Sequence, residues 1–477
     1  MNYGMIKYTL GWLLIFEAGF FLVPLITGLC FLELATFAFL LAMAIAAGIG
    51  TLLILKPPAS KNLYAKDGFV IVALSWITLS LFGALPFMFC GATTNFADAL
   101  FETVSGFTTT GATIFSDIES LPNCILIWRS FTNWIGGMGV LVFIMAFLPL
   151  GGAHNMNIMK AESPGPSVSK LVPKVKTTAL LLYVIYFSLT LIQLILYLIG
   201  GATLFEAINI SFSTAGTGGF SIKNDSFNSY STYLQIVATV FMFLFSINFN
   251  SYFLLLKGKF KDAFNTEVKV FFIVVITAIT IITIDIYSGF NTIGEAIKHA
   301  AFSVVSVIST TGFSTVDFNL WPELSRTFIV AIMFIGACAG STGGGIKISR
   351  FVILFKGMAR ELKMATNPRQ VKKISVDSRN IPHEVVRSVN SFIICFVAIF
   401  FFSVVALSFE EYDLITNFTA VASAMNNIGP GLELVGPYGN FGFFSVPSKL
   451  VLIFDMLAGR LELFPMLVLF TPSTWKK

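Results

Sequence analysis

Ten long runs of hydrophobic residues alternate along the chain with polar or charged segments. The apolar core of a bilayer is about 30 Å thick, so a helix needs roughly 20 residues to cross it. Every run is long enough, and the pattern predicts ten membrane-spanning helices. The runs lie at roughly 10–32, 34–55, 68–90, 124–149, 178–200, 232–256, 268–288, 327–356, 386–408 and 448–470.

A shorter apolar run lies between the two members of each of the last four pairs, at 96–107, 203–214, 294–308 and 412–425. With roughly 12–15 residues each, these runs are too short to cross a bilayer, and they predict re-entrant helices. The repeated unit predicts an all-α membrane protein with four pseudo-symmetric quarters around one central pore. We expect a two-helix hairpin at 1–60 and pore repeats at 61–160, 161–260, 261–365 and 366–477.

A stretch rich in glycine and small hydroxyl residues follows each short run, and none of the four stretches contains a charged residue. Turning successive carbonyl groups toward one axis requires backbone angles that glycine accepts. Rings of carbonyl groups can replace the water shell of a cation. Aligned on Gly111, Gly218, Gly312 and Gly429, the stretches predict a four-part selectivity filter for a monovalent cation.

Other pore classes fit these stretches less well. An anion pore favours rings of arginine or lysine, and many cation pores use rings of acidic residues. Small residues also occur where membrane helices pack closely, but four copies in one context favour the filter. The predicted filter residues are Thr109, Thr110, Gly111, Thr217, Gly218, Thr310, Thr311, Gly312, Asn427, Ile428 and Gly429. The ion is expected at Thr110, Gly111, Thr217, Gly218, Thr311, Gly312, Ile428 and Gly429.

A further small-residue run interrupts the predicted span 327–356. Glycine costs about 1 kcal/mol relative to alanine inside a helix, so the run predicts a break near the middle of the membrane. Unwound backbone at that depth must line a cavity. Gly340 and Gly345 have the spacing of a nucleotide-binding loop, but Ile346 stands where that motif requires lysine. The run comprises Gly340, Ser341, Thr342, Gly343, Gly344 and Gly345.

Arg129 and Arg460 both lie within predicted spans. Charge inside a span is costly, which makes Arg460 a candidate functional residue. An internal ion pair with Glu462 or Asp455 would also explain it. Arg129 lies near the outer end of its helix, where we expect an interfacial anchor.

Composition narrows the class of protein. Hydrophobic residues make up 56% of the chain and charged residues only 12%, too few for a soluble surface. The five cysteines and three histidines lack metal-ligand spacing, and no catalytic constellation is present, so we expect no enzyme.

Most of the 30 lysines and arginines fall on the side of both termini, which the positive-inside rule makes cytoplasmic. Lipid headgroups or a docked cytoplasmic partner would each explain the basic loop at about 357–385.

The chain resembles the Trk/Ktr/HKT superfamily of potassium transporters, its TrkH branch in particular. The resemblance rests on the four glycine stretches, on 134–139, on 340–347 and on 459–462. It implies potassium as the transported ion, with one glycine from each quarter in the filter. It also implies that the run 340–345 is an intramembrane loop closing the pore below the filter, and that Arg460 projects into the cavity there.

The same resemblance implies a homodimer in the bacterial cytoplasmic (inner) membrane, gated by a cytoplasmic ring of the TrkA type that binds the regulating nucleotide. We expect no catalytic cofactor and no nucleic-acid partner. A second hypothesis is a secondary transporter that couples a monovalent cation to protons or sodium. Such transporters often carry ionisable groups at mid-membrane. The filter stretches have none, which favours a channel-like path.

Overall fold

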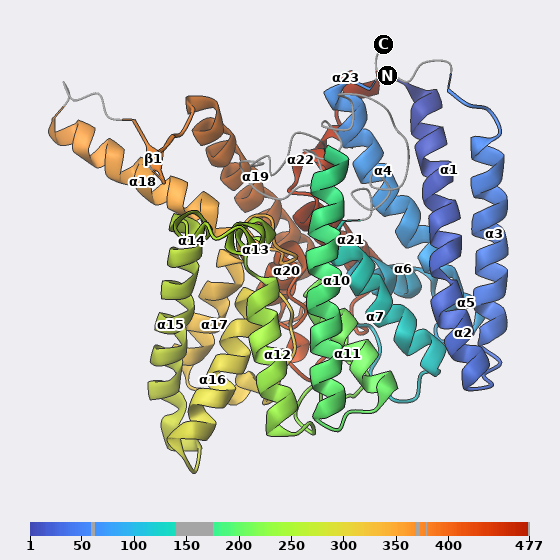
Figure 1. Ribbon diagram of the computed structural model, residues 1–477, viewed down its shortest axis with the longest axis horizontal. Helices are drawn as coiled ribbons and strands as arrows, with labels where there is room; N and C mark the ends of the chain where they lie inside the picture. The colour runs from blue at the N-terminus through green and yellow to red at the C-terminus, as the bar shows by residue number, and fades with distance from the viewer. Residues whose placement is uncertain (59–62, 140–174, 368–372, 378, 476–477) are drawn as a thin grey trace.

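The computed structural model describes residues 1–58, 63–139, 175–367, 373–377 and 379–475. Figure 1 shows an almost entirely helical molecule whose two termini lie close together. In the described residues, six helices are long and apolar enough to cross a membrane, and a seventh span results if one sharply bent pair is counted. The fold is therefore that of a helical membrane protein with several spans.

The N-terminal hairpin consists of α1 (Tyr3–Phe20), α2 (Leu22–Cys30) and α3 (Thr36–Ile54). Helices α1 and α3 lie side by side (Figure 1), and two glycines let their backbones approach. A Cβ atom on Gly11 would lie 2.9 Å from the Gly50 carbonyl oxygen, so small residues at this contact explain the close packing. The predicted span 10–32 is the pair α1 and α2, interrupted at Phe21.

The segment predicted as the first repeat, a name kept below for this segment and the three that follow, contains α4 (Ala65–Gly83), α5 (Leu85–Phe89), the short helix α6 (Phe96–Phe107) and α7 (Asn123–Gly137). Helix α6 coincides with the predicted short run 96–107. The structure describes α7, the first part of the predicted span 124–149. The remainder of that span lies outside the described residues, as do the predicted repeat boundaries at 60/61 and 160/161.

The second repeat contains α10 (Val175–Ile199), α11 (Leu204–Gly216), α12 (Thr232–Phe245) and α13 (Phe249–Leu256), and α14 (Phe260–Ala263) crosses the predicted boundary to the third. The predicted span 232–256 is not one continuous helix, because α13 bends by 89° from α12. Ser246 donates its hydroxyl to the Met242 carbonyl, and Asn248 caps α13 by accepting from the Asn250 amide. Such side-chain bonds offer the backbone an alternative to the helix.

The third repeat contains α15 (Thr266–Ile286), η1 (Tyr287–Gly289), α16 (Ile293–Ile308), η2 (Phe318–Leu320), α17 (Glu323–Ile335) and α18 (Ile348–Thr366). The predicted break in the span 327–356 is confirmed, since residues 336–347 between α17 and α18 are not helical. The basic loop expected from about 357 begins later, because α18 continues to Thr366. A small antiparallel hairpin follows, β1 (Ser375–Val376) with β2 (Arg379–Asn380).

The fourth repeat contains α19 (His383–Leu407), η3 (Ser408–Glu410), α20 (Leu414–Asn426), η4 (Glu433–Val435), α21 (Val446–Arg460), α22 (Phe464–Leu469) and α23 (Pro472–Trp475). The predicted span 448–470 is broken between α21 and α22, where Glu462 and Leu463 both have positive φ. Buried hydrophobic residues form two large clusters. One joins the hairpin with the first and fourth repeats, and the other joins mainly the second and third.

Side-chain caps fix the starts of the four short helices. Asn95 caps α6, Thr292 caps α16, and Asp413 caps α20. Thr203 and Glu206 form a capping box at α11. Capping therefore accounts for the polar residues here. Asp98, in the first turn of α6, also binds Lys449 of α21 at 2.6 Å.

Candidate functional site

The four short helices α6, α11, α16 and α20 end in the same way. Just past each helix the backbone turns left-handed, and a glycine with positive φ follows two positions later. The left-handed residues have φ between 54° and 60° and are Thr109, Thr217, Thr310 and Asn427. The glycines have φ between 70° and 103° and are Gly111, Gly219, Gly312 and Gly429.

One backbone hydrogen bond repeats in all four turns. The residue between the left-handed position and the glycine donates its amide to a serine carbonyl five residues earlier. The pairs are Thr110 to Ser105 (2.8 Å), Gly218 to Ser213 (2.9 Å), Thr311 to Ser306 (2.8 Å) and Ile428 to Ser423 (3.0 Å). The four stretches are therefore structural copies of one turn.

This repeated turn corrects the alignment of the second stretch by one residue. The alignment placed Gly218 opposite Gly111, whereas the backbone angle and the hydrogen bond place Gly219 there. Gly218 instead matches Thr110, and Gly219 matches Gly111. Two adjacent glycines look alike in sequence, and only the backbone conformation distinguishes them.

The four turns meet in a closed ring. A Cβ atom added to each positive-φ glycine would strike the carbonyl oxygen of the next loop in chain order, and the fourth loop meets the first. The distances are 2.1 Å from Gly111 to Gly218, 1.8 Å from Gly219 to Thr311, 2.1 Å from Gly312 to Ile428 and 2.9 Å from Gly429 to Thr110. At these contacts only glycine fits without displacing the neighbouring backbone.

A cavity of about 80 Å³ opens on one side of the ring, and all four positive-φ glycines line it. Asn427 links the fourth turn to the first, because its side-chain amide donates to the Thr110 hydroxyl at 3.0 Å. The ring offers carbonyl and hydroxyl oxygens and no charged side chain. Such a donor set suits a monovalent cation that has lost its water. In the described chain, no group of three His, Cys, Asp or Glu residues could hold a metal.

Residues 336–347 lie directly against the ring. The Gly344 amide donates to the Thr310 hydroxyl at 2.6 Å. A Cβ atom on Gly343 would be 2.8 Å from the Ser309 carbonyl oxygen, and one on Gly344 would be 2.5 Å from that of Asn426. The predicted run 340–345 therefore sits at the ends of two short helices, with no room for side chains at these two glycines.

Residues at the bend between α12 and α13 form hydrogen bonds with this loop. The Cys338 amide donates to the Ser246 carbonyl at 3.1 Å, and the Phe249 amide donates to the Gly340 carbonyl at 3.0 Å. The Thr342 hydroxyl donates to the Phe245 carbonyl at 3.2 Å. Hydrogen bonds to neighbouring backbone thus replace those that the broken helix cannot supply.

A second cavity, of about 100 Å³, is lined by the loop residues Gly340, Ser341 and Gly343–Gly345 and by Arg460. The guanidinium of Arg460 donates to the carbonyls of Thr342 at 2.8 Å, Gly136 at 2.5 Å and Gly137 at 2.9 Å. Arg460 therefore bridges the loop and the end of α7.

The alternative explanation for Arg460, an ion pair with Glu462 or Asp455, does not hold between these described residues. Glu462 binds Arg350 at 2.5 Å, and Asp455 accepts a hydrogen bond from Ser403 at 2.8 Å. Glycine beside the arginine explains its position, since a Cβ atom on Gly459 would lie 2.1 Å from the Met425 carbonyl oxygen. Helix α21 can thus approach the end of α20 and present Arg460 below the ring.

The expectation for Arg129 as an interfacial anchor is also wrong. Its side chain is 1% exposed and binds Glu102 of α6 at 2.7 Å. Sequence reasoning missed Glu102, although an acidic residue within an apolar re-entrant run was the available signal. It also missed Lys347, which is buried at the end of the loop and donates its ammonium group to the Gly343 carbonyl.

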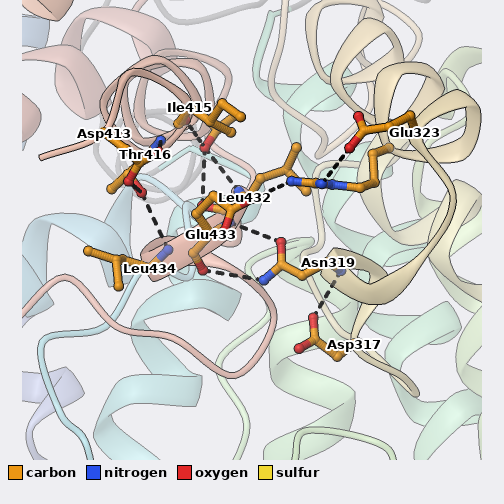
Figure 2. Close-up of polar contacts among 11 residues, drawn as sticks. Asp317, Asn319, Glu323, Asp413, Ile415, Thr416, Leu432, Glu433 and Leu434 are labelled. Atoms are coloured by element: carbon orange, nitrogen blue, oxygen red, sulfur yellow. Dashed lines mark hydrogen bonds and ion pairs between the residues drawn. The ribbon is translucent and has the colours of Figure 1, made fainter.

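Polar contacts connect the third and fourth repeats on the side of the first cavity. Figure 2 shows Asn319 facing Glu433, with the Glu433 amide donating to Asn319 at 2.9 Å and Asn319 donating to the Glu433 carbonyl at 3.3 Å. Arg326 of α17 binds both Glu323, at 2.8 Å, and Glu433. These contacts fix the loop that follows the fourth turn.

Comparisons with known proteins agree with this geometry. Residues 35–477 match the sequence profile of the TrkH family, described as cation transport protein. The chain is 35% identical to the Trk system potassium uptake protein TrkH of Halomonas elongata over the full length of both. It is 32% identical to TrkG of Escherichia coli strain K12 over 95% of each.

A solved structure gives the same result. The crystal structure of the potassium transporter TrkH from Vibrio parahaemolyticus superposes with a TM-score of 0.90 at 32% identity, and the match covers the whole of both chains. The likeness extends from the N-terminal hairpin to the last helix.

Proposed function

Since this chain belongs to the TrkH family of cation transport proteins, we propose that it takes up potassium through a channel-like pore. It is a multi-pass membrane transport protein and not an enzyme. The observation that carries the proposal is the closed ring of four homologous turns, in which each glycine abuts the carbonyl of the next loop. A ring of uncharged oxygens suits a dehydrated monovalent cation, and the relatives are potassium uptake proteins.

The ion path runs from the first cavity through the ring to the second. The filter residues are those predicted, with Gly219 added as the partner of Gly111. The loop 336–347 lies beneath the ring and serves as the gate. Arg460 lies in the lower cavity, where its positive charge raises the barrier for a passing cation.

In the membrane, this proposal implies ten spans and four re-entrant helices arranged with pseudo-four-fold symmetry. The hairpin comprises residues 1–60, and the repeats have the boundaries given above, with the gate loop in the third. Both termini face the cytoplasm of a bacterial cell, across its inner membrane. The assembly is a homodimer controlled by a nucleotide-binding ring of the TrkA type.

The test is ion flux into liposomes that contain the purified protein, with potassium and sodium gradients varied separately. A current that reverses at the potassium equilibrium potential and ignores an imposed pH gradient supports the pore. Accumulation of potassium against its own electrochemical gradient, driven by an imposed proton or sodium gradient, would establish a coupled transporter instead. Protein-free liposomes and liposomes with heat-denatured protein provide the background.

A further inference from the structure

A buried ion pair lies directly behind the ring. Glu102 of α6 and Arg129 of α7 are 0% and 1% exposed, and the Arg129 Nε atom is 2.7 Å from the Glu102 carboxylate. Burying two charges carries a large desolvation penalty, which good geometry must offset. The contacts of this pair therefore indicate what it does.

Both partners bind the segments that leave the first two turns. Glu102 accepts hydrogen bonds from the Ile114 amide at 2.9 Å and from the Thr113 hydroxyl at 3.0 Å. Arg129 donates to the Ser221 carbonyl at 3.0 Å and lies 4.2 Å from the centre of the Phe220 ring. Thr113 and Ser221 each lie two residues beyond a positive-φ glycine of the ring.

The pair thus connects the first loop to the second. These two loops meet where a Cβ atom on Gly111 would lie 2.1 Å from the Gly218 carbonyl oxygen. We call this contact the first seam. Arginine suits the position because its planar fork donates in several fixed directions at once.

The positions that match Glu102 and Arg129 in the other three quarters all lie in the described residues. No such ion pair occurs at these positions. Measured from the repeated turn, Glu102 corresponds to Ile210, Ser303 and Ala420, all buried. Arg129 is the seventh residue of its helix, and the seventh residues of α12, α17 and α21 are Ala238, Ile329 and Leu452, all buried. Uncharged residues therefore complete the same packing in three quarters, so filling space does not require the ion pair.

We propose that Glu102 and Arg129 are positioning residues that fix the first seam and thereby set the discrimination between potassium and sodium. This inference rests on the proposed function. The seam is held by the ion pair, by the three hydrogen bonds described above and by a fourth from the Arg129 guanidinium to the Thr113 hydroxyl at 3.3 Å. It resists contraction, so its carbonyl groups do not close around the smaller sodium ion. Without the pair, the first two loops would move independently, and the ring would accommodate both ions.

The test uses two conservative variants in the liposome assay. Arg129→Lys keeps the charge and loses the fork that reaches both loops, and Glu102→Gln keeps the shape and loses the charge. We expect the potassium-to-sodium permeability ratio to fall roughly three- to tenfold in each, the factor that one or two ordinary hydrogen bonds represent. Potassium flux should fall less than the ratio does, because a less rigid ring also increases the sodium permeability.

Asp98→Asn is the matched control. Asp98 is also an acidic residue of α6 with a cationic partner, but its carboxylate binds Lys449 of α21 and lies at the opposite end of the helix from the ring turn. The control should keep the wild-type permeability ratio. Wild-type ratios in both Arg129→Lys and Glu102→Gln overturn the proposal, and so does an equal loss in Asp98→Asn.

Size-exclusion profile and thermal stability are measured for each variant. If Glu102→Gln does not fold, Arg129→Lys alone decides the outcome. Wild-type protein that carries no potassium current would refute the proposed function itself. A selective wild type with equally selective variants would refute only the role of the pair.

Discussion

Replacing Gly111 with serine is the most direct test of the ring. Gly111 has φ of +79°, and a Cβ atom there would lie 2.1 Å from the Gly218 carbonyl oxygen. Real Cβ atoms essentially never approach closer than 3.0 Å, so the first seam must open by about 1 Å. Gly218 is itself a proposed ion-binding position, and the displacement therefore acts on the ring directly.

The size of the effect follows from two terms. A left-handed conformation costs a residue with a Cβ atom about 1–2 kcal/mol, and the collision adds to this. If the binding free energy of potassium relative to sodium weakens by the same amount, about 1–2 kcal/mol, the permeability ratio falls roughly 5- to 30-fold. A change of 1.4 kcal/mol corresponds to a factor of ten. Total flux should persist, because the other three seams remain closed.

Gly91→Ser separates the two terms. Gly91 has a similar φ of +75°, but no atom lies within 4 Å of the place that its Cβ atom would take, so the variant carries the backbone cost without the collision. Both variants are compared by reversal potential in liposomes under potassium and sodium gradients, after their amounts are equalised by fluorescence-detected chromatography. An unchanged ratio in folded Gly111→Ser would refute the ring as the selectivity filter, and an equal loss in Gly91→Ser would attribute the effect to stability.

Three further outcomes are expected. Gly219→Ala should impair potassium selectivity as strongly as Gly111→Ser, because its Cβ atom would lie 1.8 Å from the carbonyl of the third loop; normal selectivity would restore the original alignment of the second stretch. Arg460→Ala should raise potassium flux per protein, because it removes a positive charge from the lower cavity; its hydrogen bonds to the Thr342, Gly136 and Gly137 carbonyls are also lost, so the melting temperature should fall, and unchanged flux in the folded variant would contradict the barrier role. Thr310→Val removes the acceptor of the Gly344 amide, a bond worth about 1 kcal/mol, and should raise flux in the absence of any regulator several-fold, whereas constant flux would show that this bond does not hold the gate.

Hydropathy and repetition predicted the larger features of this fold. The short runs at 96–107 and 294–308 correspond closely to α6 and α16, because a run of fixed length between two spans leaves few alternatives. The break at 340–345 was predictable because glycine disfavours the helix interior. The convergence of four loops was predicted from their repetition, whereas the prediction of potassium and the predicted role of Arg460 rested on the resemblance to a known family.

The remaining features depend on contacts that no local pattern encodes. Gly218 and Gly219 are equivalent in sequence, and only the hydrogen bond to Ser213 distinguishes them. Arg129 could not be assigned to Glu102, because the two lie 27 positions apart on different helices. The 89° bend at Ser246 was missed because hydropathy counts a serine within an apolar run as a minor interruption.

Ring closure between the first and last repeats also has a consequence for how the protein is made. Asn427 donates to Thr110 across 317 positions of sequence, so the ring cannot exist until the final quarter of the chain has left the ribosome. A chain with three inserted repeats has the Gly429 position of its ring empty and lacks the arginine that lies below it. Late, long-range contacts of this kind are slow to form, and exposed intermediates are prone to misassembly. Synthesis therefore leaves an interval in which the first three turns exist without the fourth turn that completes the ring.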